Sequence, residues 1–149
     1  MTALLSLLAA LSGIAVAVRR NGGVPESVSA IAYIIPHWAF SSWVTVVGIL
    51  LMPGMMERLP VSWQWVGFLS VVGLLCVAAS SYYRSESKAL HYAGGWLCSL
   101  CAMAVVIILR PWLMALWAAY LLAMVAWPGD KWLFWAEAAV YALLLMATV

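Results

Sequence analysis

Charge is what this sequence has least of. Asp, Glu, Lys and Arg make up 8% of the 149 residues, whereas hydrophobic residues make up 68%. A soluble domain is usually about 25% charged and about 45–50% apolar, and a chain this short cannot hide so much apolar surface in a soluble core. These values exclude a soluble enzyme and a disordered chain, and a net charge of only +2 excludes a nucleic-acid-binding protein. An integral membrane protein remains.

Cysteine and histidine are also scarce. Three Cys, an odd number, argue against a disulfide framework, and two His with no matching Cys cluster leave no zinc pattern. Cys98 and Cys101 share one face of a predicted helix near its middle, where apolar burial makes a thiol unreactive. We therefore interpret them as structural small residues and expect neither a metal ion nor another cofactor.

Charges and prolines divide the chain into six apolar stretches, which we predict to be transmembrane helices in one all-α bundle over residues 1–149 without an extramembrane domain. Each stretch is continuous, unlike the alternating strands of a membrane barrel. About 20 apolar residues, with about 17 the minimum, cross the hydrocarbon core; the second stretch is short, so five spans is the alternative. A semi-apolar segment, 24–36, is expected to lie on the interface or dip back into the protein. The predicted spans are 2–18, 37–53, 61–83, 89–109, 111–127 and 132–149.

The distribution of basic residues predicts an orientation. The first, third and fifth connections carry Arg19, Arg20, Arg84, Lys88 and Lys131, whereas the second and fourth carry Arg58 and Arg110. The positive-inside rule then places the odd connections in the cytoplasm of a bacterial cell and both termini outside its inner membrane. The first stretch ends in a sequence that imitates a signal cleavage site, but no basic residue precedes it. We expect an uncleaved span, with cleavage as the alternative.

Aromatic and small residues follow the predicted spans. Most of the 10 Trp lie near span ends, as in an interfacial belt. Small residues spaced by four let helix backbones approach each other in a membrane. Two such stripes are predicted to be contacts inside the bundle, or a dimer face. They are Ala9, Gly13 and Ala17 in the first span, and Gly94, Cys98 and Ala102 in the fourth.

One acidic residue lies inside a predicted span. Glu137 is about 9 Å along the last helix, and a carboxylate at the centre of a span costs about 2.5–3.5 kcal/mol. We expect it to face the bundle with His91 as its partner, or else to reach back to the interface. The other polar groups start from the same side of the membrane, Glu86 among them. The candidate ligand-binding residues are His91, Glu137, Glu26, Ser29, Tyr33, Tyr92 and His37; none is assigned as catalytic.

Three segments of the chain carry a resemblance to known proteins: Pro25-Glu26-Ser27-Val28-Ser29, His91-Tyr92-Ala93-Gly94 and Lys131-Trp132-Leu133-Phe134-Trp135-Ala136-Glu137. Together they resemble small uncharacterised polytopic membrane proteins of gut bacteria, a likeness that spans most of the chain and implies no activity. A Ser-containing segment before the second span and a His opening a later one are also similar to the alkaline ceramidase superfamily. Those hydrolases have seven spans and three zinc-binding histidines, aided by Ser and Asp, whereas this chain has two His and one Asp, Asp130, in a turn. That hydrolase activity is therefore not carried over.

The hypothesis favoured by these patterns is a non-enzymatic membrane protein that binds a lipidic or other small amphipathic molecule at its cytoplasmic half. The first alternative is a metal-free, degenerate membrane hydrolase that uses Ser29, His91 and Glu137, which requires these groups within hydrogen-bond reach. The second alternative is a small subunit or assembly factor of a larger membrane complex. Besides the lipid bilayer, a second copy of the chain or a larger membrane protein is the expected partner.

Overall fold

The computed structural model describes residues 1–80, 88–127 and 129–149, and every regular element in these ranges is a helix. Four helical stretches, Thr2–Asn21, His37–Arg58, Val61–Ser80 and Lys88–Leu109, have the length and apolar composition that a membrane crossing needs. Pro111–Ala126 and Trp132–Thr148 are apolar but shorter. The helices are α1 (Thr2–Asn21), α2 (His37–Arg58), α3 (Gln64–Ser80), α4 (Lys88–Leu109), α5 (Met114–Ala126) and α6 (Trp132–Thr148), with short 3₁₀ helices η1 (Ser29–Tyr33), η2 (Val61–Trp63) and η3 (Pro111–Leu113).

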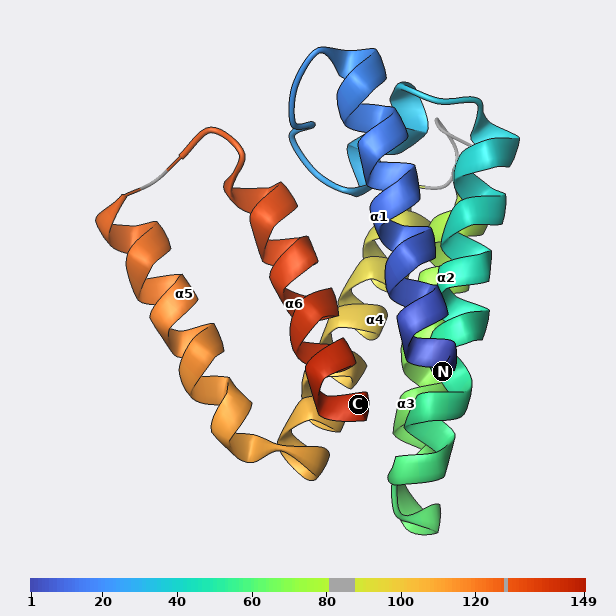
Figure 1. Cartoon of the computed structure of the whole chain (residues 1–149), viewed down its shortest axis with the longest axis vertical. Coiled ribbons are helices and arrows are strands. Elements are labelled where there is room, and N and C mark those ends of the chain that lie inside the picture. The colour runs from blue at the N-terminus through green and yellow to red at the C-terminus, as the bar shows by residue number, and fades with distance from the viewer. Residues whose placement is uncertain (81–87, 128) are drawn as a thin grey trace.

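The six helices run alternately up and down (Figure 1). The ends of α1, α3 and α5 and the starts of α2, α4 and α6 therefore lie toward one end of the molecule. We call it the basic end, because it carries Arg19, Arg20, Lys88 and Lys131; Arg84 and Glu86 lie outside the described residues. Arg58 and Arg110 lie at the opposite end, where α2 and α4 finish.

Two helices are longer than the apolar stretches that predicted them. α1 continues to Asn21 and ends at Gly22, whose φ of 71° is the left-handed conformation that closes many helices. α2 runs through Pro53, the expected end of the second span, to Arg58. A proline in a helix removes one backbone hydrogen bond, but Met55 and Leu59 beyond it are buried in the core, and this packing continues the helix.

Small residues bring neighbouring helices together, as the two stripes predicted. Gly94 and Ala102 of α4 are buried, and a Cβ on Gly94 would lie 2.7 Å from the carbonyl oxygen of Gly73 on α3. On α1, the indole ring of Trp43 from α2 covers Gly13, and its Nε1–H donates to the carbonyl of Ala9 over 2.7 Å. Both stripes are therefore contacts inside the bundle.

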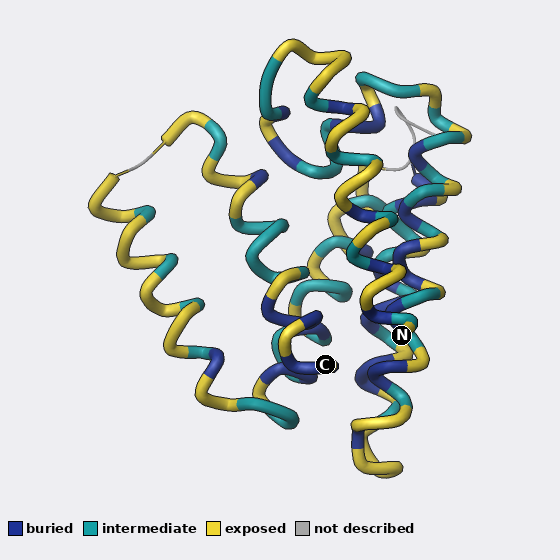
Figure 2. The backbone as a smooth tube through the Cα atoms, in the orientation of Figure 1, coloured by how far each residue is buried: buried dark blue, intermediate teal, exposed yellow. Residues whose placement is uncertain are grey.

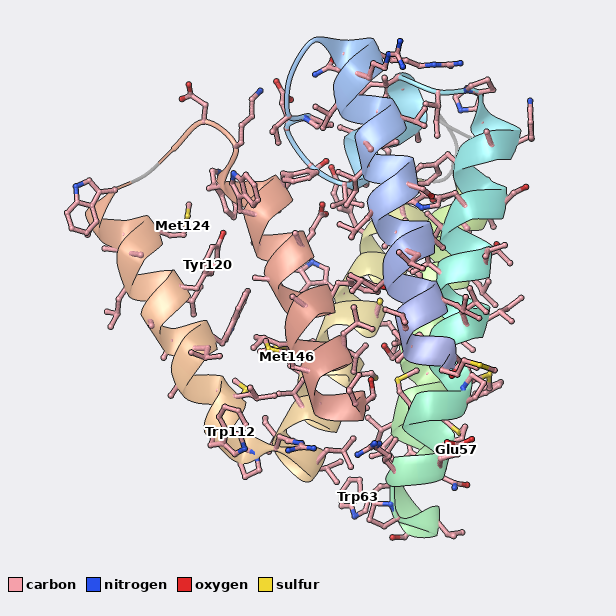
Figure 3. All side chains as sticks on the ribbon, in the orientation of Figure 1. Glu57, Trp63, Trp112, Tyr120, Met124 and Met146 are labelled. Carbon is pink, nitrogen blue, oxygen red and sulfur yellow. The ribbon has the colours of Figure 1, made fainter. Side chains whose placement is uncertain are left out.

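Helix α5 is packed more loosely than the rest. None of its residues, all of which are described, is buried, and its tube is largely yellow in Figure 2. Tyr120 and Met124 point toward α6, and Met146 of α6 points toward α5 (Figure 3). The Tyr120 hydroxyl donates to the carbonyl of Trp132 over 2.9 Å. The core that positions the polar groups is therefore formed by α1 to α4 and α6.

Candidate functional site

The chain between α1 and η1 crosses the first turns of α6, and three hydrogen bonds hold it there. The Phe134 N–H donates to the carbonyl of Glu26 over 3.1 Å. In the other direction, the Val28 N–H donates to Oε2 of Glu137 over 2.5 Å, and the Ser29 N–H also binds this carboxylate. We call residues 26–30 the 26–30 loop. Its backbone and the start of α6 thus satisfy each other's free polar groups.

A serine inside the loop fixes its shape. The Ser27 hydroxyl oxygen accepts a hydrogen bond from the Ala30 N–H over 2.9 Å, which closes the turn that leads into η1. Beyond it, Ile31 and Ala32 are buried in a small core with Ala17, Phe40 and Val44. The loop is therefore held by its hydrogen bonds to α6 and, directly after it, by the apolar packing of Ile31 and Ala32.

Behind the loop lies a cavity of about 140 Å³ between α2, α3, α4 and α6, the inner cavity. Its walls are mainly apolar, and Ser29 and Glu137 line it together. Since the Ser29 N–H binds the Glu137 carboxylate, both groups lie at the same end of the cavity. Its other lining residues are Val28, Phe40, Val44, Gly48, Leu51, Ser70, Val71, Leu74, Val77, Gly95, Cys98, Ser99, Ala102, Val140, Tyr141 and Leu144.

Two hydroxyl groups of the inner cavity bind the protein itself. The Tyr141 hydroxyl donates over 2.8 Å to the hydroxyl of Ser6, a residue outside the cavity lining, which in turn donates to the carbonyl of Val47 over 2.9 Å. The Ser70 hydroxyl donates to the carbonyl of Cys98 over 3.2 Å. Glu137 is the one acidic or basic residue among the described residues that line this cavity. It is therefore the strongest polar group available to a molecule inside.

A second, more polar pocket of about 310 Å³ lies on the other side of Ser29 and Phe40, which line both spaces. We call it the outer pocket. His91 of α4 contributes its ring, whose Nδ1 is hydrogen-bonded to the Ser80 hydroxyl over 2.9 Å. The pocket thus combines charged, hydroxyl and aromatic groups at the basic end. Its lining residues are Glu26, Ser27, Ser29, Ala30, Ala32, Tyr33, Phe40, Ser80, Lys88, His91, Tyr92 and Leu133.

The structure distributes the residues singled out in the sequence between these two spaces. Glu137 lines the inner cavity, and Ser29 belongs to both. His37 lines neither, and its buried Nδ1 has no hydrogen-bond partner among the described residues. Glu86 lies outside the described residues. The candidates that line the outer pocket are Glu26, Ser29, Tyr33, His91 and Tyr92.

The expected pair of His91 with Glu137 is not found among the described hydrogen bonds. The 26–30 loop brings its backbone N–H groups to Glu137, whereas α4 places His91 beside Ser80 at the end of α3. Sequence reasoning also missed Ser27 and Ser80. A Ser whose hydroxyl can bind the backbone N–H three residues later is a turn signal that could have been found; the contact between Ser80 and His91 depends on how α3 packs on α4.

The arrangement is better suited to binding than to hydrolysis. A serine nucleophile needs a base within hydrogen-bond reach, but the Ser29 hydroxyl contacts that of Ser27 over 3.1 Å, and the Ser80 hydroxyl beside His91 donates its hydrogen to the carbonyl of Val77 over 2.8 Å. No group of three or more metal-ligating side chains was found in the part of the chain that the structure describes. An apolar cavity that adjoins a polar pocket can instead hold a molecule with one apolar and one polar part.

Comparison with known proteins identifies no relative of this chain, so the resemblances inferred from the sequence remain predictions. No family model, no curated protein and no solved structure matches the chain.

Proposed function

We propose that the protein is a multi-pass membrane protein that binds a small amphipathic molecule. The observation that carries this proposal is the junction of the two spaces at Ser29 and Phe40. The apolar part of the ligand occupies the inner cavity, and its polar part lies at the junction with the outer pocket, through which the ligand enters. The role is non-enzymatic.

The size of the inner cavity limits the apolar part of this ligand. An engineered apolar cavity of about 150 Å³ stays dry and binds benzene, and the inner cavity measures about 140 Å³. The apolar part therefore corresponds to a single ring or the end of a short chain. A longer acyl chain would have to extend into the outer pocket.

All six helices cross the bacterial inner membrane in this proposal, with α5 and α6 as the shortest spans. The basic end faces the cytoplasm, in accordance with the positive-inside rule, and both termini face outward. The alternation of the helices (Figure 1) supports this orientation, because it gathers Arg19, Arg20, Lys88 and Lys131 at one end.

Cysteine labelling tests the orientation. We expect Pro60→Cys, in a background with the native Cys replaced by Ser, to react with a membrane-impermeant maleimide on intact spheroplasts. Asn21→Cys at the end of α1 should react only after the membrane is permeabilised, because it lies on the cytoplasmic side. The reverse pattern would contradict the orientation, and labelling of both positions from one side would contradict the alternate crossing of the helices.

Filling the inner cavity tests the ligand site. Gly95 lines the cavity, and a Cβ there would meet no heavy atom within 4 Å, so the side chain of Gly95→Leu has room to grow without displacing a helix. We expect this variant to weaken the binding of 4-fluorobenzyl alcohol, a ring-sized neutral probe, by about tenfold or more, equivalent to about 1.4 kcal/mol. Binding is measured by ¹⁹F NMR on protein in phosphatidylcholine nanodiscs.

The matched control is Ala93→Leu, since Ala93 is an exposed residue of α4 that lines neither space. It should bind the probe as the parent protein does, because the added side chain lies away from both. Saturable binding that Gly95→Leu leaves unchanged would show that the probe does not use the inner cavity.

A further inference from the structure

The inner cavity contains an acidic group without a basic partner. Glu137 is half-buried, and the residues that line the cavity with it include no Lys, Arg or His in the described part of the chain. Lys88 and His91 line only the outer pocket, where His91 is bound to Ser80. The protein partners of Glu137 are the backbone N–H groups of Val28 and Ser29.

This position makes a charged carboxylate costly and a bound cation favourable. Removing a carboxylate from water is unfavourable unless a compensating charge is close, and opposite charges attract far more strongly in apolar surroundings than in water. A carboxylate has roughly four lone-pair positions for hydrogen bonds, and two N–H groups leave some of them free. The ammonium group of a ligand can therefore both bind and neutralise Glu137.

The other walls of the cavity favour the same ligand. Phe40 and Tyr141 line the cavity together with Glu137, and aromatic faces attract a cation through the negative charge of the ring face. Tyr141 is four residues after Glu137 in α6, so the ring and the carboxylate lie on the same face of this helix. The remaining lining is mostly aliphatic, which suits an uncharged hydrocarbon body.

We propose that the inner cavity binds a small organic cation, a protonated amine whose apolar body is about the size of one ring. Its ammonium group donates hydrogen bonds to the carboxylate of Glu137 at the junction with the outer pocket, and its ring lies among the aliphatic side chains of α2, α3 and α4. This inference rests on the proposed function, since it specifies the chemical class of the amphipathic ligand. An anion of the same shape would be repelled by Glu137.

Three probes of nearly equal shape separate charge from size. They are 4-fluorobenzylamine, 4-fluorobenzyl alcohol and 4-fluorophenylacetate, which are positive, neutral and negative at pH 7. Binding of each is measured by ¹⁹F NMR with the protein in phosphatidylcholine nanodiscs, whose lipid carries no net charge. We expect the parent protein to bind the amine at least tenfold more tightly than the alcohol, and the acid more weakly than either.

The variant Glu137→Gln tests whether this preference comes from Glu137. Its amide oxygen can still accept the Val28 N–H, so the 26–30 loop stays in place, but the negative charge is gone. We expect it to lose at least tenfold in affinity for the amine while its affinity for the alcohol changes less than twofold. Glu57→Gln, at an exposed residue of α2 that lines neither space, is the matched control and should retain the preference for the amine.

Each outcome is informative. Equal affinities for amine and alcohol in the parent protein overturn the inference, and so does a Glu137→Gln variant that keeps the amine preference or loses both ligands equally. The order of the three probes on the parent protein remains a test if Glu137→Gln does not fold. If the alcohol binds and the amine binds no more tightly, only the inference of a cationic ligand is refuted. If none of the probes shows saturable binding, the proposed function is refuted as well.

Discussion

Replacing Gly94 by Ala is expected to destabilise the protein by about 1–3 kcal/mol, the usual cost of an extra methyl group in a tightly packed core. The added Cβ would lie 2.7 Å from the Gly73 carbonyl oxygen and 3.1 Å from the Val77 nitrogen. Both atoms belong to the backbone of α3 and cannot rotate away, so the two helices would have to separate. Among the described helices, α3 and α4 share the most extensive contact.

The neighbouring residue is the control. Gly95→Ala meets no heavy atom within 4 Å, and Ala stabilises a helix interior by roughly 0.5–1 kcal/mol relative to Gly. The two variants have the same composition and differ only in which side of α4 carries the methyl group. Thermal unfolding in detergent, followed by size-exclusion chromatography, should give Gly94→Ala a lower midpoint than the parent and Gly95→Ala an equal or higher one. Equal midpoints would mean that α3 and α4 are not in close contact.

The helix contacts show how much of the fold the sequence could predict. The spacing of Gly94, Cys98 and Ala102 predicted a face of α4 that contacts another helix, because small residues in a membrane helix have few other uses. The spacing could not tell that Gly73 of α3 is the partner of Gly94. That pairing depends on the distance and angle between two helices, which a pattern within one helix does not contain.

The helix boundaries could also be predicted from the sequence only in part. Pro60 precedes η2 and Pro111 opens η3, as proline at a helix start predicts. Pro53 was expected to end α2, but the helix continues because the residues after it are buried against other helices. A proline therefore predicts a helix boundary well where the chain leaves the bundle, and less well where packing against other helices continues the helix beyond it.

The candidate site was predictable in its location but not in its contacts. The excess of polar groups on one side of the predicted spans indicated a cluster at the basic end, and Glu26, Tyr33, His91 and Tyr92 line one pocket there. The partner of Glu137 was predicted as a side chain, whereas the structure gives it backbone N–H groups. Every residue except proline carries such a group, so its use depends on the path of the 26–30 loop, which no residue pattern in the sequence specifies.

Truncating Glu137 is expected to release this loop. Glu137→Ala leaves the N–H groups of Val28 and Ser29 without their acceptor, and a buried polar group that loses its partner costs about 1–3 kcal/mol. The loop also borders the outer pocket, so water can replace part of the lost bonding, and we expect the lower half of that range for each group. The bond from the Phe134 N–H to the Glu26 carbonyl remains, which keeps the loop near α6.

Amide hydrogen exchange measures this release where it occurs. In Glu137→Ala the amides of Val28 and Ser29 should exchange at least tenfold faster than in the parent protein, while those of the α3–α4 contact keep their protection, because the opening is local. Glu26→Ala is the matched control: the loop uses the Glu26 carbonyl and not its exposed side chain, so exchange should not change. Unchanged exchange in Glu137→Ala would mean that the carboxylate does not hold the loop. Two results together would separate the two roles of Glu137: faster exchange in Glu137→Ala, and normal exchange with weaker amine binding in Glu137→Gln. An uncharged hydrogen-bond acceptor is enough to hold the loop, whereas only the charged carboxylate attracts a cation.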